Sequence, residues 1–299
     1  MQKGIAAIVG PGLVGTDLMY KLLRCSRHLR LVYVVGLDPG DGISRAQAAG
    51  LVTSVDGVDW LLNQTQLPDV VFDATNARSH VANAPRFEQA GIAAIDLTPS
   101  AVGPYCVPAV NQPAGMNVSM VTSGGQASVP VVAAVSRIVP VQYAEVVTTL
   151  PSSAVGPGSR TDIDQYTTTT ADALVKVGGA LDGKAILVLN PGEPPMAMRS
   201  TVFCSIPPEL VDDEDTRRAI SQSIQQAVAE LGVPGYQLRS EPQFDEPRDV
   251  WNGMARVAAF LQISGAGDYL PPYAGNLDII TSAAVRAGDQ MVEACHDRA

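Results

Sequence analysis

The first part of the chain combines short apolar runs with a helical pattern of apolar residues. Residues 5–9 form an apolar run, and Leu18, Met19, Leu22 and Leu23 then recur at the spacing of a helix. Three later apolar runs predict further strands: 31–36, 70–76 and 93–98. Strands that alternate with helices favour a parallel α/β sheet.

The pattern changes after residue 135. Further strands are predicted over 143–150, 184–190, 200–206 and 256–264, helices over 163–177, 215–231 and 276–292, and a loop over 155–160. We therefore predict an α/β protein with an N-terminal Rossmann domain over 1–135, completed by a C-terminal helix within 270–299. The intervening residues 136–269 are predicted to form an α+β domain for substrate binding and dimerisation.

A glycine turn between the first strand and the first helix predicts a dinucleotide site. Residues 10–15 are Gly-Pro-Gly-Leu-Val-Gly. In this pattern Gly10 allows a tight turn, Gly12 lets a pyrophosphate approach the backbone, and Gly15 lets helix and strand pack closely. The helix that begins near Leu13 and Val14 directs unpaired N–H groups and the positive end of its dipole at the phosphates. The expected cofactor is NAD.

Polar residues that follow the apolar runs extend the predicted cofactor site. Asp38 lies about 20 residues beyond the glycine turn, where an acid binds the ribose of NAD and repels the extra phosphate of NADP. The alternative for Asp38 is a solvated carboxylate that opens a turn. Thr75, Asn76 and Thr98 lie at strand ends, where open α/β sheets bind ligands, although each could instead cap a helix. His80 falls on a predicted helix, and we expect a structural role for it.

Charge and composition narrow the ligands and the location. The 299-residue chain has a formal net charge of -10 at pH 7. This disfavours nucleic acid and anionic membranes as partners, because both require basic surfaces. Apolar runs such as 129–135 are too short to span a bilayer, and the N-terminus leads directly into a strand, so we expect a cytoplasmic protein. The four cysteines are too widely spaced for a zinc site, and we expect no metal.

The residues around position 123 resemble a known nucleophile loop. Residues 121–127 are Val-Thr-Ser-Gly-Gly-Gln-Ala, and the acylating acetaldehyde dehydrogenases usually have a cysteine in place of Ser123. Further similar segments follow in the family's order: 15–19, 72–75, 95–99, 103–108, 156–158, 188–191, 193–195 and 273–278. The resemblance implies an enzyme that oxidises acetaldehyde with NAD and coenzyme A to acetyl-CoA, usually in complex with an aldolase.

The departures from the family pattern fall at positions that the resemblance implies are catalytic. Ser123 replaces the nucleophilic cysteine, Ser200 replaces an aspartate that acts as a base near the thiol, and Ser153 stands near the place of a lysine. The segment over 243–256 is also shorter than in the family. A single engineered change from cysteine to serine would account for Ser123 alone, so we favour natural divergence. By contrast, Asn276 matches an asparagine at the family's active site.

These departures lead to three hypotheses for the function. The first is an NAD(H)-dependent oxidoreductase that passes hydride directly to or from a small carbonyl or imine, because a serine hydroxyl without a strong base is a poor nucleophile. Ser123, Asn276 and Tyr105 are then expected to polarise the substrate, although Ser123 could instead be a turn residue. The second is the acylating reaction with serine in place of cysteine, and the third is a non-catalytic NAD-binding scaffold. We expect a homodimer, and the resemblance implies an aldolase partner.

Overall fold

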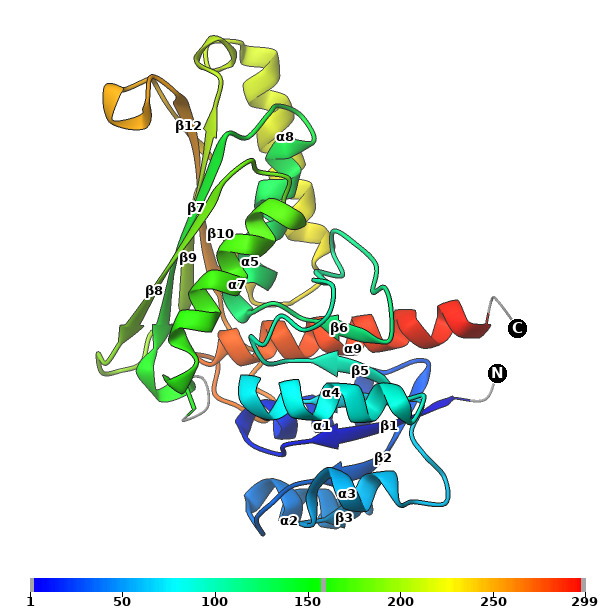
Figure 1. Cartoon of the computed structure of the whole chain (residues 1–299). Helices are drawn as coiled ribbons and strands as arrows, with labels where there is room; N and C mark the ends of the chain where they lie inside the picture. The colour runs from blue at the N-terminus through cyan, green and yellow to red at the C-terminus, as the bar shows by residue number, and fades with distance from the viewer. Residues whose placement is uncertain (1–2, 157–159, 297–299) are drawn as a thin grey trace.

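The computed structural model of the chain describes residues 3–156 and 160–296. The N-terminal part of this described region contains a six-stranded parallel sheet with the order β3-β2-β1-β4-β5-β6 (Figure 1). Its strands are β1 (Gly4–Val9), β2 (Leu29–Val35), β3 (Val52–Ser54), β4 (Val70–Asp73), β5 (Ala93–Asp96) and β6 (Asn117–Ser119). This is the strand order of a Rossmann domain, in which ligands bind where the order reverses beside the first strand.

Helices cover both faces of this sheet. They are α1 (Leu13–Cys25), α2 (Asp41–Ala48), α3 (Gly57–Leu62) and α4 (Ala77–Gln89). β1 is buried along its whole length because α1 and the C-terminal helix pack on one face while α3 and α4 pack on the other. Burial on both faces explains why its sequence is continuously apolar instead of alternating.

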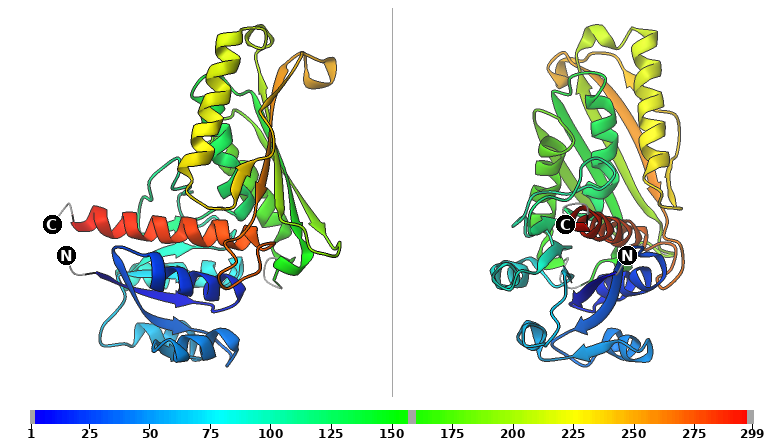
Figure 2. Two further views of the ribbon diagram at one scale, coloured as in Figure 1. Left: turned by 180° about the vertical axis from the view of Figure 1, so that it is seen from behind. Right: turned by 90° about the vertical axis from the view of Figure 1, so that its right-hand side faces the viewer.

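The second part of the described chain has its own sheet, with the order β10-β12-β9-β7-β8 and β11 paired to β12. The strands are β7 (Tyr143–Pro151), β8 (Gly183–Asn190), β9 (Met198–Ile206), β10 (Tyr236–Leu238), β11 (Gln243–Asp245) and β12 (Ala255–Ile263). Burial alternates along β7 and β9, because only one face of the sheet is in the core. That face is covered by α5 (Ser123–Ser136), α7 (Ile163–Lys176) and α8 (Glu214–Glu230), and the other face is open (Figures 1 and 2).

The C-terminal helix α9 (Gly275–His296) joins the two parts by packing against α1 and α5 (Figure 1). A buried ion-pair cluster fixes it to α1. Lys21 Nζ lies 2.5 Å from Asp17 Oδ2 and 2.7 Å from Asp278 Oδ1, and the Thr281 hydroxyl donates to Asp17 Oδ2 at 2.5 Å. The predicted fold class, including a C-terminal helix that returns to the Rossmann domain, is confirmed.

Helix α5 packs with the second sheet. Val129, Val131, Val132 and Val135 share one hydrophobic core with β7, β9 and α8. The expected boundary at residue 135 assigns this helix to the N-terminal domain, whereas its packing moves the division to the turn before α5. The helix is buried and apolar on nearly every side, so its sequence has no amphipathic period that would indicate which surface it contacts.

The other predicted elements are present with small shifts of their ends, whereas the sequence did not predict the short elements β3, β6, β10, β11, α2 and α3. The helix expected over 215–231 is α8, and the helix expected over 276–292 is the longer α9. Of the loop expected over 155–160, residues 157–159 lie outside the described residues. No helix in the described part of the chain is long and apolar enough to cross a membrane.

Candidate functional site

The glycine turn before α1 has the geometry that a dinucleotide requires. Gly10 has φ +88°, and a Cβ there would lie 2.9 Å from the backbone of Ala74, so a larger residue would be strained and crowded. A Cβ at Gly15 would lie 2.2 Å from the Gly10 carbonyl oxygen, whereas a Cβ at Gly12 would meet no atom within 4 Å. Gly12 is the N-cap of α1 without a capping side chain. The N–H groups at the start of this helix, whose first residue is the exposed Leu13, are therefore open to an anion.

A cavity of about 520 Å³ opens over this turn. Gly10, Gly12, Asp38 and Thr75 all line it, which brings four of the predicted cofactor residues together. Val14, another predicted cofactor residue, instead lines a second, smaller cavity, which Ser123 also lines. The open backbone, the uncapped helix start and the cavity fit the pyrophosphate and a ribose of NAD.

Three carboxylates line the cofactor cavity. Asp59 is paired with Arg86, and Asp56 accepts a hydrogen bond from the Ser54 hydroxyl at 3.1 Å. Asp38 is exposed and makes no hydrogen bond or ion pair within the described residues. A free carboxylate at this place can accept the ribose hydroxyls of NAD and repel the additional phosphate of NADP.

Replacing Asp38 by asparagine should lower the preference for NAD over NADP. Asparagine keeps the size of the side chain and removes the charge that repels the phosphate, so the ratio of the two affinities should fall about tenfold, equivalent to about 1.4 kcal/mol. Calorimetric titration with both cofactors measures the ratio. Asp41→Asn removes a charge from the adjacent helix α2 outside the cavity and serves as the control. An unchanged ratio in Asp38→Asn would exclude Asp38 from the cofactor site.

The three predicted contacts at strand ends have different environments. The Thr75 hydroxyl donates to Asp73 Oδ1 at 2.5 Å. Asn76 caps α4 by accepting from the Ser79 N–H at 2.9 Å, which is the capping alternative considered from the sequence. The Thr98 hydroxyl is buried and has no partner within the described residues. Asn76 and Thr98 line neither the cavity over the glycine turn nor the cavity at Ser123, so their contact with the cofactor stays a prediction.

His80 lies fully buried between two aspartates at the ends of β4 and β5. Its Nδ1 is 3.0 Å from Asp73 Oδ2, and its Nε2 is 3.8 Å from Asp96 Oδ2. Burial alone would lower the pKa of His80, but the hydrogen bond that its Nδ1–H donates to Asp73 and the charge of Asp96 outweigh burial and raise that pKa. Burial also raises the pKa of Asp96 to about 6. The cluster connects the two strand ends, which is the structural role expected for His80.

The turn before Ser123 is strained. Val121 has φ +61°, a conformation that β-branched residues rarely adopt. Thr122 then caps α5 by accepting from the Gly125 N–H at 2.9 Å, and Ser123 is the first residue of the helix. A strained turn from a strand into a helix is a typical way to present a reactive side chain.

The side chain of Ser123 faces a small cavity of about 70 Å³. Residues from both domains line it, including Val14, Leu97, Leu150, Tyr166, Asn276 and Leu277. Because Val14 belongs to the first turn of α1, the cavity lies beside the glycine turn. It has room for a ligand of only a few heavy atoms.

Tyr166 on α7 contacts Ser123, and nothing in the sequence indicated this contact. Its hydroxyl oxygen lies 3.2 Å from Ser123 Oγ and accepts a hydrogen bond from the Gly124 N–H at 2.8 Å. Tyr166 lies within a helix that was predicted correctly, but no spacing or motif links it to a serine 43 positions away. Only the packing of α7 against α5 brings the two hydroxyls together.

Asn276 lies at the start of α9 and is nearly completely buried. Its Nδ2 donates to the Ala154 carbonyl oxygen at 3.0 Å, while its Oδ1 has no partner within the described residues. This orphaned acceptor lines the same cavity as Ser123. It can accept a hydrogen bond from a ligand that carries an N–H or O–H group.

Ser200 and Tyr105 lie outside this cavity. Ser200 is buried on β9 with its Oγ 3.1 Å from Thr148 Oγ1. Thr148 Oγ1 in turn lies 3.0 Å from the place of a Cβ on Gly124, so one side chain separates Ser200 from the Ser123 loop. The Tyr105 hydroxyl instead donates to Asp172 at 3.3 Å. This bond holds Tyr105 against α7 and away from Ser123, so the structure does not bring it to the substrate as expected.

Cys106 is not a candidate nucleophile. Its side chain is buried beneath the Ser123 loop, where the Gln126 amide donates to its backbone carbonyl at 2.8 Å. Burial raises the pKa of Cys106 to about 12, so the thiolate that acts as a nucleophile is not populated at neutral pH.

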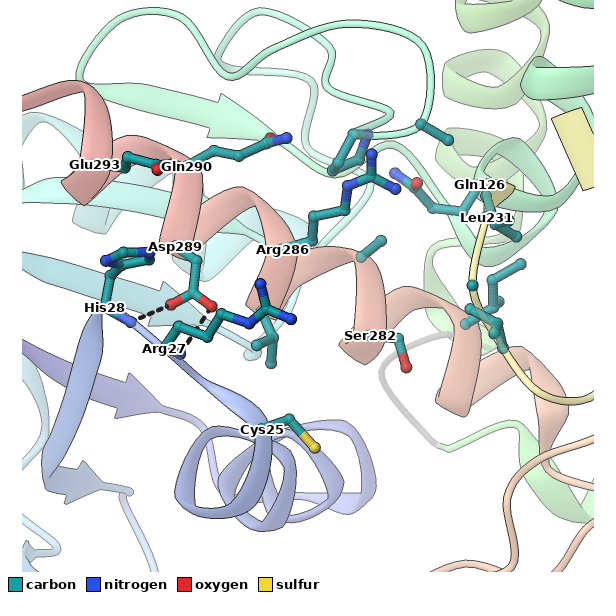
Figure 3. Close-up of a pocket in the computed structure, with 17 residues that line it drawn as sticks. Cys25, Arg27, His28, Gln126, Leu231, Ser282, Arg286, Asp289, Gln290 and Glu293 are labelled. Atoms are coloured by element: carbon teal, nitrogen blue, oxygen red, sulfur yellow. Dashed lines mark hydrogen bonds between the residues drawn. The ribbon is translucent and has the colours of Figure 1, made fainter. Parts of the chain in front are cut away.

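Another cavity, of about 530 Å³, lies between the end of α1 and the outer side of α9 (Figure 3). Arg27, Arg286 and Gln126 line it, and the Asp289 carboxylate accepts from the backbone N–H groups of Arg27 and His28 at its edge. None of the residues predicted to bind cofactor or substrate lines it. The cavities over the glycine turn and at Ser123 are therefore the candidate active site.

Comparison with known proteins assigns the family. Residues 123–271 match the family model described as prokaryotic acetaldehyde dehydrogenase, dimerisation. Over 296 residues the chain is 52% identical to acetaldehyde dehydrogenase 6 of Rhodococcus jostii strain RHA1, which covers 97% of each protein. The chain belongs to the acetaldehyde dehydrogenase family. It is also 52% identical over 298 residues to a CoA-propanoylating propanal dehydrogenase of Mycobacterium tuberculosis strain H37Rv, with 98% of this chain and 96% of that protein covered.

The fold agrees with this assignment. A solved structure of aspartate semialdehyde dehydrogenase II from Vibrio cholerae, complexed with ASA, matches with a TM-score of 0.64 and 10% identity, and 98% of this chain and 99% of that one are covered. At this identity the likeness concerns the fold alone. Membership of the acetaldehyde dehydrogenase family confirms the predicted NAD-dependent oxidoreductase. The match to a dimerisation domain supports a homodimer.

Proposed function

We propose that this protein transfers hydride directly between NAD(H) and a small aldehyde, without a covalent intermediate. The observation that carries the proposal is one small cavity faced by the Ser123 hydroxyl and the orphaned Asn276 Oδ1. Within the described residues, the hydrogen-bond partner of Ser123 Oγ is another hydroxyl, that of Tyr166. A serine needs a strong base to attack a carbonyl, and a hydroxyl partner is not one.

The residues of the cavity suit a bound aldehyde. Ser123 can donate a hydrogen bond to the carbonyl oxygen and so polarise the carbon. Leu97, Leu150 and Leu277 provide apolar walls that exclude water. The cavity volume of about 70 Å³ restricts the substrate to a short chain, in line with relatives named for acetaldehyde and propanal.

The cofactor residues complete the arrangement. When NAD is bound, its nicotinamide ring provides or accepts the hydride. The N–H groups at the start of α1 hold the pyrophosphate, and Asp38 holds a ribose. The buried Asn276 Oδ1 has no partner within the described residues, and a hydrogen bond donated by the carboxamide of the nicotinamide would satisfy it.

A second candidate function is the CoA-dependent acylating reaction with Ser123 as the nucleophile. Two observations favour it: the name of the mycobacterial relative and the place of Ser123 on a strained turn at a helix N-terminus. The departures at Ser123 and Ser200 weigh against it, because both the thiol and its base are then absent. An aldolase that supplies the aldehyde stays a prediction from the family.

The two functions differ in product and in the need for coenzyme A. With NADH and propanal, we expect NADH oxidation and propanol formation that do not depend on coenzyme A. Ser123→Ala should lower kcat/KM by about tenfold to a hundredfold, since it removes a hydrogen bond that strengthens as charge develops on the oxygen. Ser136→Ala removes a hydroxyl without a partner from the far end of α5 and serves as the control. Rapid propanoyl-CoA formation from propanal, NAD and coenzyme A, abolished by Ser123→Ala, would establish the acylating function instead.

A further inference from the structure

The hydroxyl of Tyr166 reaches the candidate active site, and no step proposed so far uses it. It lies 3.2 Å from Ser123 Oγ and lines the same cavity. Gly124 makes this approach possible, because a Cβ there would lie 2.5 Å from the Tyr166 hydroxyl oxygen. The loop that carries Ser123 is thus shaped to admit a phenol.

The hydrogen bonds around Tyr166 leave its proton free for the cavity. The Gly124 N–H donates to the phenol oxygen at 2.8 Å. A phenol has a single proton, which must then be donated to another acceptor. Ser123 Oγ is one acceptor within reach, and the oxygen of an aldehyde bound beside Ser123 is another.

The first turn of α5 also stabilises the anion that remains after proton transfer. Gly124 is the second residue of this helix, where N–H groups lack intrahelical partners and the helix dipole is positive. Burial raises the pKa of Tyr166 above its ordinary value, so the phenol stays protonated near neutral pH. It releases the proton only to a stronger base, and an alkoxide is such a base.

From this geometry we infer that Tyr166 is a catalytic residue, the general acid that protonates the substrate oxygen when the aldehyde is reduced. The inference rests on the proposed direct hydride transfer. As the carbonyl carbon accepts the hydride, a C–H bond forms and the π electron pair of the carbonyl moves to oxygen. The O–H bond of Tyr166 then breaks as the O–H bond of the alcohol forms, while Ser123 donates a second hydrogen bond to the same oxygen.

The reaction is balanced without a further reagent. NADH is oxidised to NAD and the aldehyde is reduced to the alcohol. The Tyr166 phenolate regains its proton from water after the alcohol has left, so one proton is taken from solvent in each turnover. In the reverse direction the phenolate accepts the proton of the alcohol.

Tyr166→Phe tests this role because it removes only the hydroxyl. We expect kcat for NADH-dependent propanal reduction to fall about 10²-fold to 10³-fold, with KM for propanal changed by less than about threefold. The solvent deuterium isotope effect of the wild-type protein on single-turnover hydride transfer should disappear. Tyr236→Phe is the matched control, because the buried Tyr236 hydroxyl also donates to α5, at the Ala127 carbonyl, and lies outside the cavity.

The outcomes distinguish a failure of the role inferred for Tyr166 from a failure of the proposed hydride transfer. If the wild-type protein reduces propanal and Tyr166→Phe keeps more than about a third of its kcat, the role of Tyr166 is overturned and direct hydride transfer stands. If the wild-type protein does not reduce aldehydes with NADH, both are overturned. NADH binding and thermal melting of each variant show whether it is folded.

A second replacement covers the case of an unstable phenylalanine variant. Difluorotyrosine at position 166 keeps the hydroxyl and lowers its pKa. The alkaline limb of the pH profile of kcat should then move to lower pH. A limb that does not move overturns the assignment of Tyr166 as the acid.

Discussion

The double variant Ser123→Cys with Ser200→Asp should form acyl-CoA far faster than the product of the two single effects predicts. Cysteine at position 123 supplies the nucleophile, and its place at the N-terminus of α5 lowers the thiol pKa. An aspartate at position 200 supplies the base that the family resemblance implies at this position. Groups that act as one catalytic unit are non-additive, so we expect the double variant to exceed the better single variant by about 10²-fold or more.

The structure gives the reason why the aspartate is needed. Ser200 is separated from the Ser123 loop by Thr148, whose hydroxyl lies 3.1 Å from Ser200 Oγ. A longer, buried carboxylate at position 200 extends toward the loop, and burial raises the pKa of a carboxylate toward the range of a useful base.

The measurement is propanoyl-CoA formation from propanal, NAD and coenzyme A by both single variants and the double variant. Ser136→Cys combined with Ser200→Asp places the thiol at the far end of α5 and should stay inactive. High activity of Ser123→Cys alone would contradict the prediction. It would mean that Ser123 is the only significant departure from an acylating enzyme.

Lys21→Met should destabilise the fold by about 3–5 kcal/mol, because it leaves two buried carboxylates without their cation. The side chains of Lys21, Asp17 and Asp278 are 8%, 4% and 9% exposed. Asp17 and Lys21 belong to α1 and Asp278 to α9, so the loss should also loosen the contact between the two helices.

Chemical denaturation gives the change in the free energy of unfolding. Lys176→Met is the control, because Lys176 pairs with Asp172 within α7 at the surface, with its side chain 61% exposed. Exposed pairs contribute little, so this variant should change stability by less than about 1 kcal/mol. Equal changes in the free energy of unfolding for the two lysine replacements would show that the buried cluster stabilises the fold no more than an exposed ion pair does.

Local sequence patterns were sufficient to predict the cofactor-binding half of the protein. Gly10, Gly12 and Gly15 follow an apolar run and precede a helical pattern, so the strand, turn and helix could all be recognised within 20 consecutive residues. Strand and helix positions could be predicted because they depend on periods of two and 3.6 residues. The family could be predicted because segments along the whole chain, such as 121–127, resemble those of the family in the same order.

The substrate site could not be predicted in the same way, because it is formed by contacts between residues that are distant in the sequence. Asn276 was proposed only from the family, and its unpartnered oxygen appears only when α9 lies beside α5. Tyr105 was proposed for the same site, yet its hydroxyl donates to Asp172 and it does not line the cavity at Ser123. A single sequence contains no signal for such side-chain directions.

The sequence by itself determined the Rossmann turn, the positions of the longer strands and of most long helices, and the family. These features are local, or they are patterns of residue identity along the chain. The replacement of a thiol by Ser123 stays a prediction from the family resemblance. The tertiary structure alone decided that α5 packs with the second sheet, that Lys21 neutralises Asp17 and Asp278, and that Tyr166 contacts Ser123. The reason is physical. A helix that is buried on nearly every side has no preferred face, and a hydroxyl or an ammonium group finds its partner only after the packing of whole helices has brought distant residues together.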